Sequence, residues 1–322
     1  MESSKFFALL KAVEYGSLTK AADELGYTQA GLTHMMNRLE KEIGITLLQR
    51  TKTGVSLTAD GEELLPLIQN FTEQGLELEK AIINCFEKHK GNYGRIRIKK
   101  ALFQDGINIS ENKIARIMKE HGLVAKSGRT GRKKAPKPTE EQYIEENLIK
   151  DKFKINIPNY LWCSDITELK CKGNKIYVCG VIDVATRRLV GWSIKPHQRQ
   201  DIVQEAFEMA VGRNPERPGD AVYHSDRGCQ YTAKKTKELV EKCGFRKSMS
   251  RPGTPSDNQP IESFWHTLEC EMPDIRHLTF EEASRVLVKY FELYYNSDRL
   301  HSGIGYLTPN EYFKKLTFQF VH

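Results

Sequence analysis

Three acidic residues, each in a distinctive local sequence, constrain the fold of this chain most strongly. Asp165 lies in WCSDIT, Asp226 in HSDRG and Glu262 in DNQPIESFW, with 60 residues between the two aspartates and 35 between Asp226 and Glu262. Carboxylates on separate elements can hold two Mg²⁺ ions roughly 3.5–4 Å apart, an arrangement that stabilises both the attacking and the leaving oxygen of a phosphodiester displacement. The fold must therefore bring the three side chains together, and their chemistry indicates an enzyme that acts on a nucleic-acid backbone.

The length and composition of the chain are typical of a multidomain globular protein. Its 322 residues are enough for two or three domains, with 39% hydrophobic and 28% charged residues. No apolar run of about 18 residues is present, so neither a membrane span nor a membrane partner is expected. The first residues lack the pattern of a signal peptide, and a cytoplasmic, nucleoid-associated location is expected.

The seven cysteines include no Cys-x-x-Cys pair. Cys163, Cys171 and Cys179 recur every eight residues, which invites a metal-binding interpretation. They lie in or beside apolar strand patterns without an accompanying His pair, so buried, reduced thiols are predicted instead. Cys229 is likewise interpreted as a packing residue rather than a nucleophile.

Positive charge is concentrated in the middle of the sequence, although the whole chain carries a net charge of +7. Residues 91–150 hold 14 Lys and Arg against 7 Asp and Glu, whereas residues 1–90 hold 10 against 13 and residues 151–322 hold 25 against 22. A local basic stretch suits a polyanion such as DNA, and the alternative is a solvated lysine-rich surface.

Residues 1–60 carry the pattern of a helix-turn-helix. The predicted elements are a helix that ends at Gly16, helices over 18–25 and 29–43, and a β-wing over 46–57. Ser17, Thr28 and Thr58 are each placed to cap the helix that follows. Polar side chains on the outer face of the third helix and on the wing can reach bases or phosphates. The expected DNA contacts are Gln29, Thr33, His34, Arg38, Arg50 and Lys52.

About residues 3–85 resemble the DNA-binding domain of LysR-type transcriptional regulators. The residues that carry this resemblance include Gly16–Ala22, Gln29, Arg38–Glu40, Leu47, Arg50, Leu57, Thr58 and Gly61. The resemblance implies a winged helix-turn-helix that binds double-stranded DNA.

A seven-residue apolar repeat follows, through Leu64, Ile68, Phe71, Gly75, Leu78, Ile82 and Cys85. This seam predicts a long helix that pairs with a second subunit, so a homodimer or higher oligomer is expected. In LysR-type regulators the corresponding helix joins two subunits. The alternative is that the stripe packs within one chain. Pro66 is expected to kink this helix and Gly75 to weaken it.

The basic middle of the chain predicts a second, weaker helix-turn-helix. Two short helices are expected around Gly106, the second capped by Ser110 and ended by Gly122. Residues 126–155 read as an extended basic linker. DNA contacts from these segments are expected at Arg95, Arg97, Lys113, Arg116, Arg129, Arg132, Lys133 and Lys134.

The last part of the chain alternates strand and helix patterns. Three meandering strands are predicted at 161–169, 176–182 and 188–194, followed by a helix at 199–211, a strand at 221–225, a helix at 232–243 and a helix through Glu269. Asp165 then lies within the first strand and Asp226 follows the fourth, while Glu262 lies in early turns of the last helix, which Ser256 or Asp257 can cap. This element order predicts an RNase H-like domain. Asp183 and His224 are interpreted as structural.

Residues 86–315 resemble transposases of the insertion sequence 3 family, which carry a retroviral-integrase-type core. The matching residues include Trp162–Thr167, His224–Tyr231, Glu262–Phe264, Tyr295, Asn296, Arg299, His301, Ser302, Thr308 and Pro309. The resemblance implies a transposase that cuts DNA at mobile-element ends and transfers the strand. It assigns the catalytic and metal-binding triad to Asp165, Asp226 and Glu262, with two Mg²⁺ or Mn²⁺ ions. Asp165 would bridge both ions, and the other two acids would each complete one.

Glu269 departs from the pattern of that family. It lies seven residues after Glu262 and so on nearly the same helical face, where the family usually has Lys or Arg. A carboxylate there would repel the DNA backbone, and the activity of this copy is left open.

Three interpretations therefore remain. The first is a DDE transposase with an added sequence-specific DNA-binding domain. The second is a LysR-type regulator fusion whose transposase half is inactive, and the third is the product of an accidental fusion. No pattern of an effector-binding domain is present, so no small-molecule effector is expected.

The predicted fold class is multidomain, with an all-α winged N-terminal part, a small helical domain and an α/β RNase H-like integrase core. The predicted boundaries are 1–60 for the winged helix-turn-helix, 61–90 for the linker and dimerisation helix, 91–125 for the second helix-turn-helix-like segment, 126–155 for the basic linker and 156–316 for the core.

Overall fold

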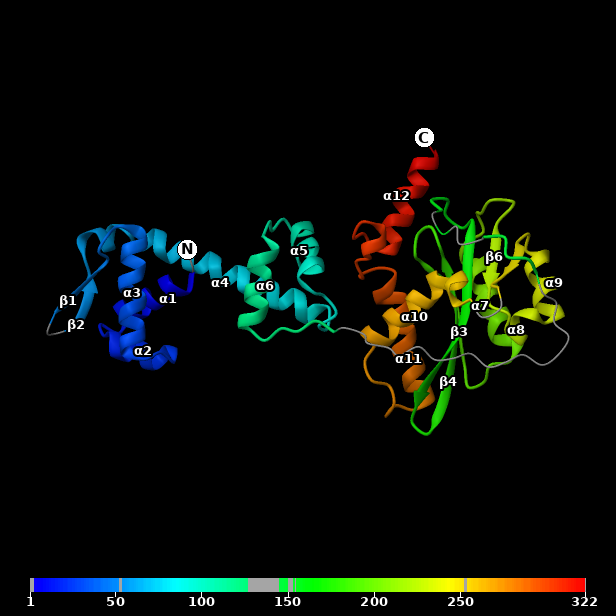
Figure 1. Ribbon diagram of the computed structural model, residues 1–322, viewed down its shortest axis with the longest axis horizontal. Coiled ribbons are helices and arrows are strands. Elements are labelled where there is room, and N and C mark those ends of the chain that lie inside the picture. The colour runs from blue at the N-terminus through cyan, green and yellow to red at the C-terminus, as the bar shows by residue number, and fades with distance from the viewer. Residues whose placement is uncertain are drawn as a thin grey trace. The chain divides into compact units, whose positions relative to one another are not determined.

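The computed structural model describes residues 3–51, 54–126, 145–149, 153, 155–251 and 254–321. The chain divides into two compact units, Met1–Val124 and Ala125–His322. Figure 1 shows a helical unit with a two-stranded wing and a second unit in which helices surround a sheet. The predicted class, all-α and winged at the N-terminus and α/β at the C-terminus, is confirmed. Five predicted DNA contacts lie outside the described residues, namely Lys52, Arg129, Arg132, Lys133 and Lys134.

The first helices form the predicted helix-turn-helix. The elements are α1 Ser3–Glu14, α2 Leu18–Leu25, α3 Gln29–Ile43 and a wing of β1 Leu48–Thr51 antiparallel to β2 Gly54–Leu57. Ser17 accepts a hydrogen bond from the backbone N–H of Lys20, and Thr28 accepts one from Gly31, so both predicted caps are confirmed. The helices enclose a core of fully buried Leu9, Leu32, Met36 and Leu39.

Helix α4, Ala59–Lys88, begins at the predicted cap Thr58 and continues without interruption through Pro66. Thr58 Oγ1 accepts a hydrogen bond from the backbone N–H of Gly61 over 3.0 Å, while its hydroxyl donates to Thr46 O. No described helix, α4 included, has the length and apolar character that a membrane span requires.

Both ends of the predicted apolar seam on α4 pack within the chain. Ile68 is buried in the helix-turn-helix core, while Ile82 and Cys85 are buried where α4 contacts α5 and α6. Phe71 of the seam, in contrast, remains 42% exposed, and Leu67, which lies outside the seam one helical turn earlier, is 66% exposed. The intramolecular alternative therefore accounts for the ends of the seam, and pairing with a second subunit stays a prediction.

Helices α5 Arg95–Gln104 and α6 Glu111–Glu120 complete the first unit. Ser110 caps α6 by accepting a hydrogen bond from the backbone N–H of Lys113, as predicted. Buried Ile98, Leu102, Ile114 and Ile117 join the two helices, which gives the predicted second helix pair its own small core.

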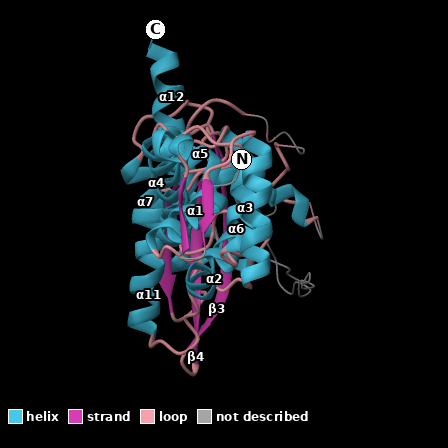
Figure 2. Cartoon of the chain, turned by 90° about the vertical axis from the view of Figure 1, so that its left-hand side faces the viewer, coloured by secondary structure: helices cyan, strands magenta, loops and turns pink. Residues whose placement is uncertain are grey.

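The second unit is built on a five-stranded sheet with the order β5-β4-β3-β6-β7. The strands are β3 Leu161–Cys171, β4 Asn174–Asp183, β5 Leu189–Lys195, β6 Val222–Ser225 and β7 Arg246–Met249. The first three form the predicted antiparallel meander, and β6 and β7 add in parallel. Strands β3 and β4 are the long arrows labelled in Figure 2. Strand β7 was not predicted, because a four-residue segment containing Arg246 and Lys247 lacks an apolar alternation.

Helices cover both faces of this sheet (Figure 1). They are α7 Gln200–Arg213, α8 Cys229–Thr232, α9 Lys234–Lys242, α10 Gln259–Glu271, α11 Phe280–Lys289 and α12 Pro309–Val321, with a π-helical turn at Tyr290–Tyr295 and 3₁₀ turns at Pro255–Asn258 and Ser302–Ile304. One core surrounds Trp162 and Phe207 beneath α7, and the other surrounds Phe264 and Phe291 beneath α10 and α11.

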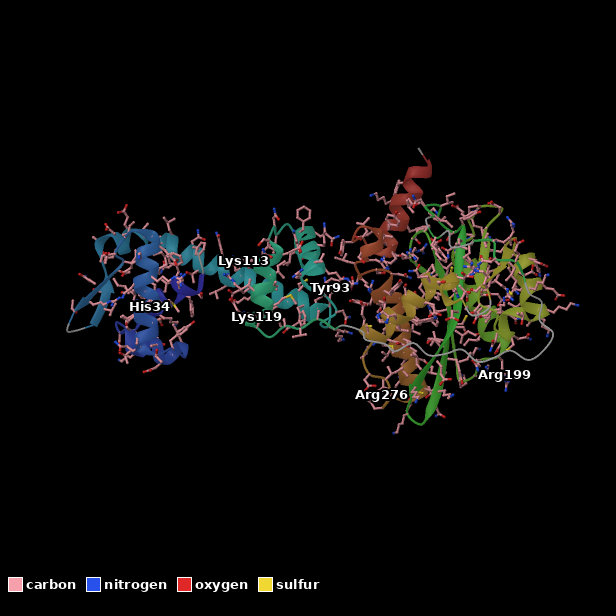
Figure 3. All side chains as sticks on the ribbon, in the orientation of Figure 1. His34, Tyr93, Lys113, Lys119, Arg199 and Arg276 are labelled. Carbon is pink, nitrogen blue, oxygen red and sulfur yellow. The ribbon has the colours of Figure 1, made fainter. Side chains whose placement is uncertain are left out.

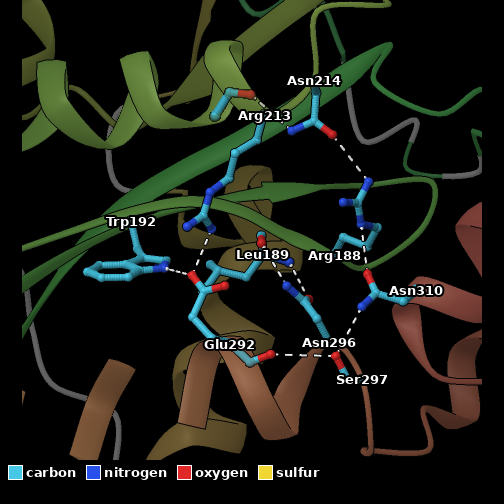
Figure 4. Close-up of polar contacts among 10 residues, drawn as sticks. Arg188, Leu189, Trp192, Arg213, Asn214, Glu292, Asn296, Ser297 and Asn310 are labelled. Carbon is cyan, nitrogen blue, oxygen red and sulfur yellow. Dashed lines mark hydrogen bonds and ion pairs between the residues drawn. The ribbon is translucent and has the colours of Figure 1, made fainter. Parts of the chain in front are cut away.

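The segment after α11 protects the outer edge of β5. Asn296 pairs with the backbone of Leu189, accepting from its N–H and donating to its carbonyl. Figure 4 shows this pair beside Glu292, whose Oε1 accepts hydrogen bonds from the Trp192 indole and from Arg213. An exposed edge strand is a template for unwanted pairing, and Asn296 occupies the outer backbone groups of β5 at Leu189.

Two sequence predictions about individual residues are wrong. Neither Ser256 nor Asp257 caps α10, because Asn258 precedes that helix and no side chain there makes a capping bond. Asp257 is instead fully buried and binds the Arg251 guanidinium. Cys229 is exposed rather than packed, since it begins the short helix after the Asp226 loop. Cys163, Cys171 and Cys179 are buried and free, as predicted.

Candidate active site

The register of two parallel strands brings Asp165 and Asp226 together. Ser164 on β3 lies opposite Ser225, the last residue of β6, so Asp165 and Asp226 each follow one member of this pair. Neighbouring strands lie about 4.8 Å apart. Strand β6 ends at Ser225, which leaves Asp226 in the loop where ligand sites of α/β sheets commonly form.

Glu262 approaches this pair from a helix. It lies in the first turn of α10, and α10 packs against β3 and β4. Burial, followed by the negative charges of Asp226 and Glu262, raises the pKa of Asp165 well above its usual value. Burial and then Asp226 likewise raise the pKa of Glu262. The three carboxylates therefore share one electrostatic neighbourhood.

The three acids differ in their access to solvent. Asp165 is half-buried, whereas Asp226 and Glu262 have exposed side chains. Protein atoms nevertheless crowd Asp226 enough to raise its pKa, against the opposing hydrogen bond that the Gly228 backbone N–H donates to its Oδ1 over 2.9 Å. The site is thus open on the side of Asp226 and Glu262 and closed behind Asp165.

Trp265 closes the site behind Asp165. Its indole Nε1 donates a hydrogen bond to Asp165 Oδ2 over 3.0 Å, and this bond lowers the pKa of Asp165, although less than burial raises it. In the sequence, Trp265 lies three residues after Glu262 and carries no local sign of a role in the site. Its contact with a residue 100 positions earlier could not be read from local pattern.

A buried polar network fixes the elements behind the acids. Asn258 Nδ2 donates to the carbonyl of Ser164 over 2.9 Å, and Asp257 Oδ2 accepts from Asn147 Nδ2 and from Arg251. His224, two residues before Asp226, lies between the hydroxyls of two serines, Ser248 and Ser250. Burial lowers the pKa of His224 to about 4, so the ring is neutral at pH 7 and is structural, as predicted.

The carboxylate oxygens of the site fit a hard divalent cation, but the three side chains do not yet converge on a single coordination position. Carboxylate oxygens are the ligands that Mg²⁺ and Mn²⁺ prefer. Within the described ranges, no three His, Cys, Asp or Glu side chains already form a metal-ligand set. The fit therefore rests on the adjacent aspartates and on Glu262, whose charge already acts on Asp165.

Glu269 adds negative charge on the same helix. Its side chain is exposed, and its charge contributes to the raised pKa of Glu262. The predicted proximity of the two glutamates is consistent with this interaction.

Most predicted DNA contacts in the first unit present polar groups at the surface. Gln29, His34 and Arg38 of α3 are exposed, and Thr33 is half-buried. Figure 3 labels His34 on α3 and Lys113 on α6. Arg38 pairs with Glu42, and Arg50 donates to Asn37 on α3.

The predicted contacts of the second helix pair differ in exposure. Arg95 and Arg116 are exposed and Lys113 is half-buried. Arg97 is half-buried and lies over the ring of Tyr93 at 5.6 Å, with its Nη1 donating to Asn92 O. Arg97 therefore has a packing role in addition to any contact with DNA.

Four family models match the chain. Two describe an integrase core domain, over residues 155–255 and 243–309. The bacterial regulatory helix-turn-helix model of the lysR family matches residues 4–62, and an HTH-like domain matches residues 73–131.

Among curated proteins, the chain is 36% identical over 238 residues to the transposase for insertion sequence element IS904 of Lactococcus lactis subsp. lactis (strain IL1403), covering 74% of this chain and 93% of that protein. It is 31% identical over 240 residues to transposase InsF for insertion sequence IS3A of Escherichia coli (strain K12), covering 74% and 82%.

Similar solved structures include the HTLV-2 integrase catalytic core domain in complex with magnesium, at 17% identity and a TM-score of 0.34, covering 48% of this chain and 96% of that one. Another is the CbnR_DBD–DNA complex, at 30% identity and a TM-score of 0.23, covering 24% and 88%.

Proposed function

Since the chain belongs to the family of insertion-sequence transposases, being 36% identical over 238 residues to a relative of which it covers 93%, we propose that Asp165, Asp226 and Glu262 are its catalytic triad. The family makes the protein a DDE polynucleotidyl transferase with an integrase core and helix-turn-helix DNA-binding domains. The observation that supports the triad most strongly is the β3–β6 register, which sets Asp165 beside Asp226. The influence of Glu262 on the pKa of Asp165 supports the third member.

Asp165, Asp226 and Glu262 are also the residues that would hold two Mg²⁺ or Mn²⁺ ions. Bound cations supply an activated hydroxyl nucleophile and stabilise the leaving oxygen of the phosphodiester. Asp165, half-buried and oriented by Trp265, fixes the inner side of the site. Asp226 and Glu262 are exposed, so they face the side from which a DNA strand can approach.

The helical unit supplies DNA recognition in this proposal. The winged helix-turn-helix at 1–60 presents α3 to double-stranded DNA, and the helix pair at 91–125 with the linker at 126–155 adds phosphate contacts to the core at 156–316. Because DNA is the substrate in this proposal, a cytoplasmic, nucleoid-associated location is proposed as well.

A homodimer or higher oligomer is proposed through the segment 61–90, because Leu67 and Phe71 remain exposed on α4. Light scattering after size-exclusion chromatography tests this. Leu67→Glu should yield monomers if α4 joins the subunits, and an unchanged mass for this variant would exclude that surface.

The regulator alternative has less support. The lysR-family model covers residues 4–62, whereas the transposase relatives match 74% of the chain. Glu269 is the one observation that favours an inactive core, because its exposed carboxylate adds to the charge around Glu262.

The test is strand joining by the purified full chain on duplexes that carry the terminal sequences of its own element. Joining with Mg²⁺ or Mn²⁺, abolished by Asp165→Asn, Asp226→Asn and Glu262→Gln, is the expected result. Glu168→Gln is the control, since Glu168 is an exposed acid on the same strand as Asp165 and pairs with Lys175. Full activity in the triad variants would refute the assignment.

A further inference from the structure

Trp265 links the helix of the third acid to the first acid. It follows Glu262 by three residues, about one helical turn, on α10. Its ring is 5% exposed in the core between α10 and the sheet, yet its one polar atom, Nε1, reaches Asp165 Oδ2 over 3.0 Å. Trp265 thus packs α10 into the core and also orients the carboxylate of Asp165 on β3.

Gly180 provides the space for this contact. It lies on β4 directly opposite Asp165 in the antiparallel register. A Cβ atom at position 180 would lie 2.9 Å from Trp265 Cη2, closer than Cβ atoms approach other heavy atoms, and a tight 3.1 Å from Cζ2. Glycine within a strand weakens it and often marks a close approach of another group, which here is the indole ring. The strand residue opposite Asp165 has no side chain, and the ring of Trp265 occupies the space that one would fill.

The hydrogen bond from Trp265 orients the carboxylate of Asp165, which is a cation ligand in the proposed function. A donor on one oxygen restricts rotation of the Asp165 carboxylate and leaves its other oxygen available to bind a cation. Groups that orient metal ligands in this way typically change metal affinity by 10–100-fold when they are removed. Glu262 lies on the same helix as Trp265. Packing of the indole against Gly180 therefore also fixes the position of Glu262 relative to the sheet.

We propose that Trp265, seated on Gly180, is a positioning residue that holds Asp165 ready to bind a divalent cation and couples it to Glu262. This inference rests on the proposed function of the acids as cation ligands. Trp265 takes part in no chemical step, because it contacts the carboxylate of Asp165 and not the reacting atoms. The competing explanation is that Trp265 only fills the core.

Two variants separate these explanations. Trp265→Phe keeps an aromatic ring in the core and removes the N–H donor. Gly180→Ala leaves the donor in place and displaces the ring through the 2.9 Å contact. The matched control is Trp192→Phe, which also removes an indole donor to a carboxylate, the 2.7 Å bond to Glu292. Trp192 lies opposite Gly180 on β5, one strand further from Asp165, and its donor does not reach the acids.

Binding of Mn²⁺ is measured on the full chain without DNA by the loss of the electron paramagnetic resonance signal of the free ion. Trp265→Phe and Gly180→Ala are expected to weaken Mn²⁺ binding about 10–100-fold, while Trp192→Phe binds like the wild type. Strand joining by Trp265→Phe should recover at high Mn²⁺ concentration, whereas Asp165→Asn stays inactive. Circular dichroism establishes that each variant is folded.

The outcomes are distinguishable. Wild-type Mn²⁺ affinity in a folded Trp265→Phe variant would overturn the positioning role and leave the proposed function intact. Failure of both Trp265→Phe and Gly180→Ala to fold would assign Trp265 a packing role alone and would also overturn the inference. If Asp165→Asn binds Mn²⁺ as tightly as the wild type, the proposed function itself fails.

Discussion

Asn258 donates its side-chain Nδ2–H to the backbone carbonyl of Ser164 over 2.9 Å, across 94 positions of the sequence. Ser164 immediately precedes Asp165, and Asn258 immediately precedes α10, which carries Glu262. Both residues are buried, at 0% and 3% exposure. This bond therefore fixes the backbone next to Asp165 relative to α10, the helix of Glu262, independently of the contact between Trp265 and Asp165.

Asn258→Ala should destabilise the core and slow strand joining. Loss of this bond leaves the carbonyl of Ser164 buried without its donor, at a cost of about 1–3 kcal/mol. Misplacement of α10 by about 1 Å can lower the rate roughly 10²-fold. Trp162, Trp192 and Trp265 are the three tryptophans of the chain, and all lie in the second unit, so tryptophan fluorescence reports its unfolding.

The control for Asn258→Ala is Asn174→Ala. Asn174 also donates its side chain to a backbone carbonyl, that of Lys172, but in an exposed turn. Equal losses of stability and activity in the two variants would contradict the role given to Asn258.

Glu269→Lys is expected to increase DNA affinity and strand joining. The change removes a charge that raises the pKa of Glu262 and supplies a cation for a DNA phosphate. One added phosphate contact should steepen the dependence of log affinity on log salt by about 0.9. Fluorescence anisotropy of labelled element ends at several salt concentrations measures this slope. Glu241→Lys, the same charge change at an exposed position of α9, is the control. An unchanged slope and yield in Glu269→Lys would refute charge repulsion.

Asp183 should make the second unit less stable as the pH rises. Burial raises its pKa from 3.8 to about 6, against opposing hydrogen bonds from Thr186 and Asn159. A raised pKa in the folded state contributes stability that is complete below the unfolded pKa and is lost as the pH rises through about 6. Over roughly two pH units, this loss amounts to roughly 3 kcal/mol.

Asp183→Asn should remove this part of the pH dependence. Denaturant unfolding of the full chain, followed by tryptophan fluorescence from about pH 4 to pH 7, gives the difference between variant and wild type. That difference should change between the unfolded pKa of 3.8 and the folded pKa of about 6 and level off above it. Asp220→Asn, at an exposed position, serves as the control. A difference that is constant with pH would show that Asp183 stays ionised throughout.

The buried ion pair between Glu271 and Arg299 should matter far more to stability than exposed pairs. Arg299 Nε lies 2.8 Å from Glu271 Oε2, and the side chains are 5% and 6% exposed. Arg299→Leu removes the guanidinium charge from beside the buried Glu271 carboxylate, and a loss of about 3–5 kcal/mol is expected. Arg276→Leu breaks a pair with Asp274 of similar geometry at the surface and should change stability little. Comparable unfolding midpoints for the two variants would be inconsistent with this difference.

Local sequence predicted the caps and turns of the first unit because each depends on neighbouring residues. Ser17, Thr28, Thr58 and Ser110 all cap the helices that follow them. The meander of β3, β4 and β5 was predicted for the same reason, from alternation within each strand and a short turn at Gly173.

The contacts that organise the site could not be predicted in this way. Trp265 with Asp165 and Asn258 with Ser164 join segments 100 and 94 positions apart. Asp257 resembled a helix cap in sequence, but its carboxylate binds the Arg251 guanidinium and Asn258 takes the cap position of α10. Strand β7 forms by pairing with β6, although its own residues carry little strand pattern.

The most direct test of the central claim is anomalous scattering from crystals of the protein grown with Mn²⁺. Mn²⁺ is expected between the carboxylates of Asp165 and Asp226, with Glu262 turned towards the same ions. Mn²⁺ bound elsewhere, with these three carboxylates unligated at saturating concentration, would contradict it.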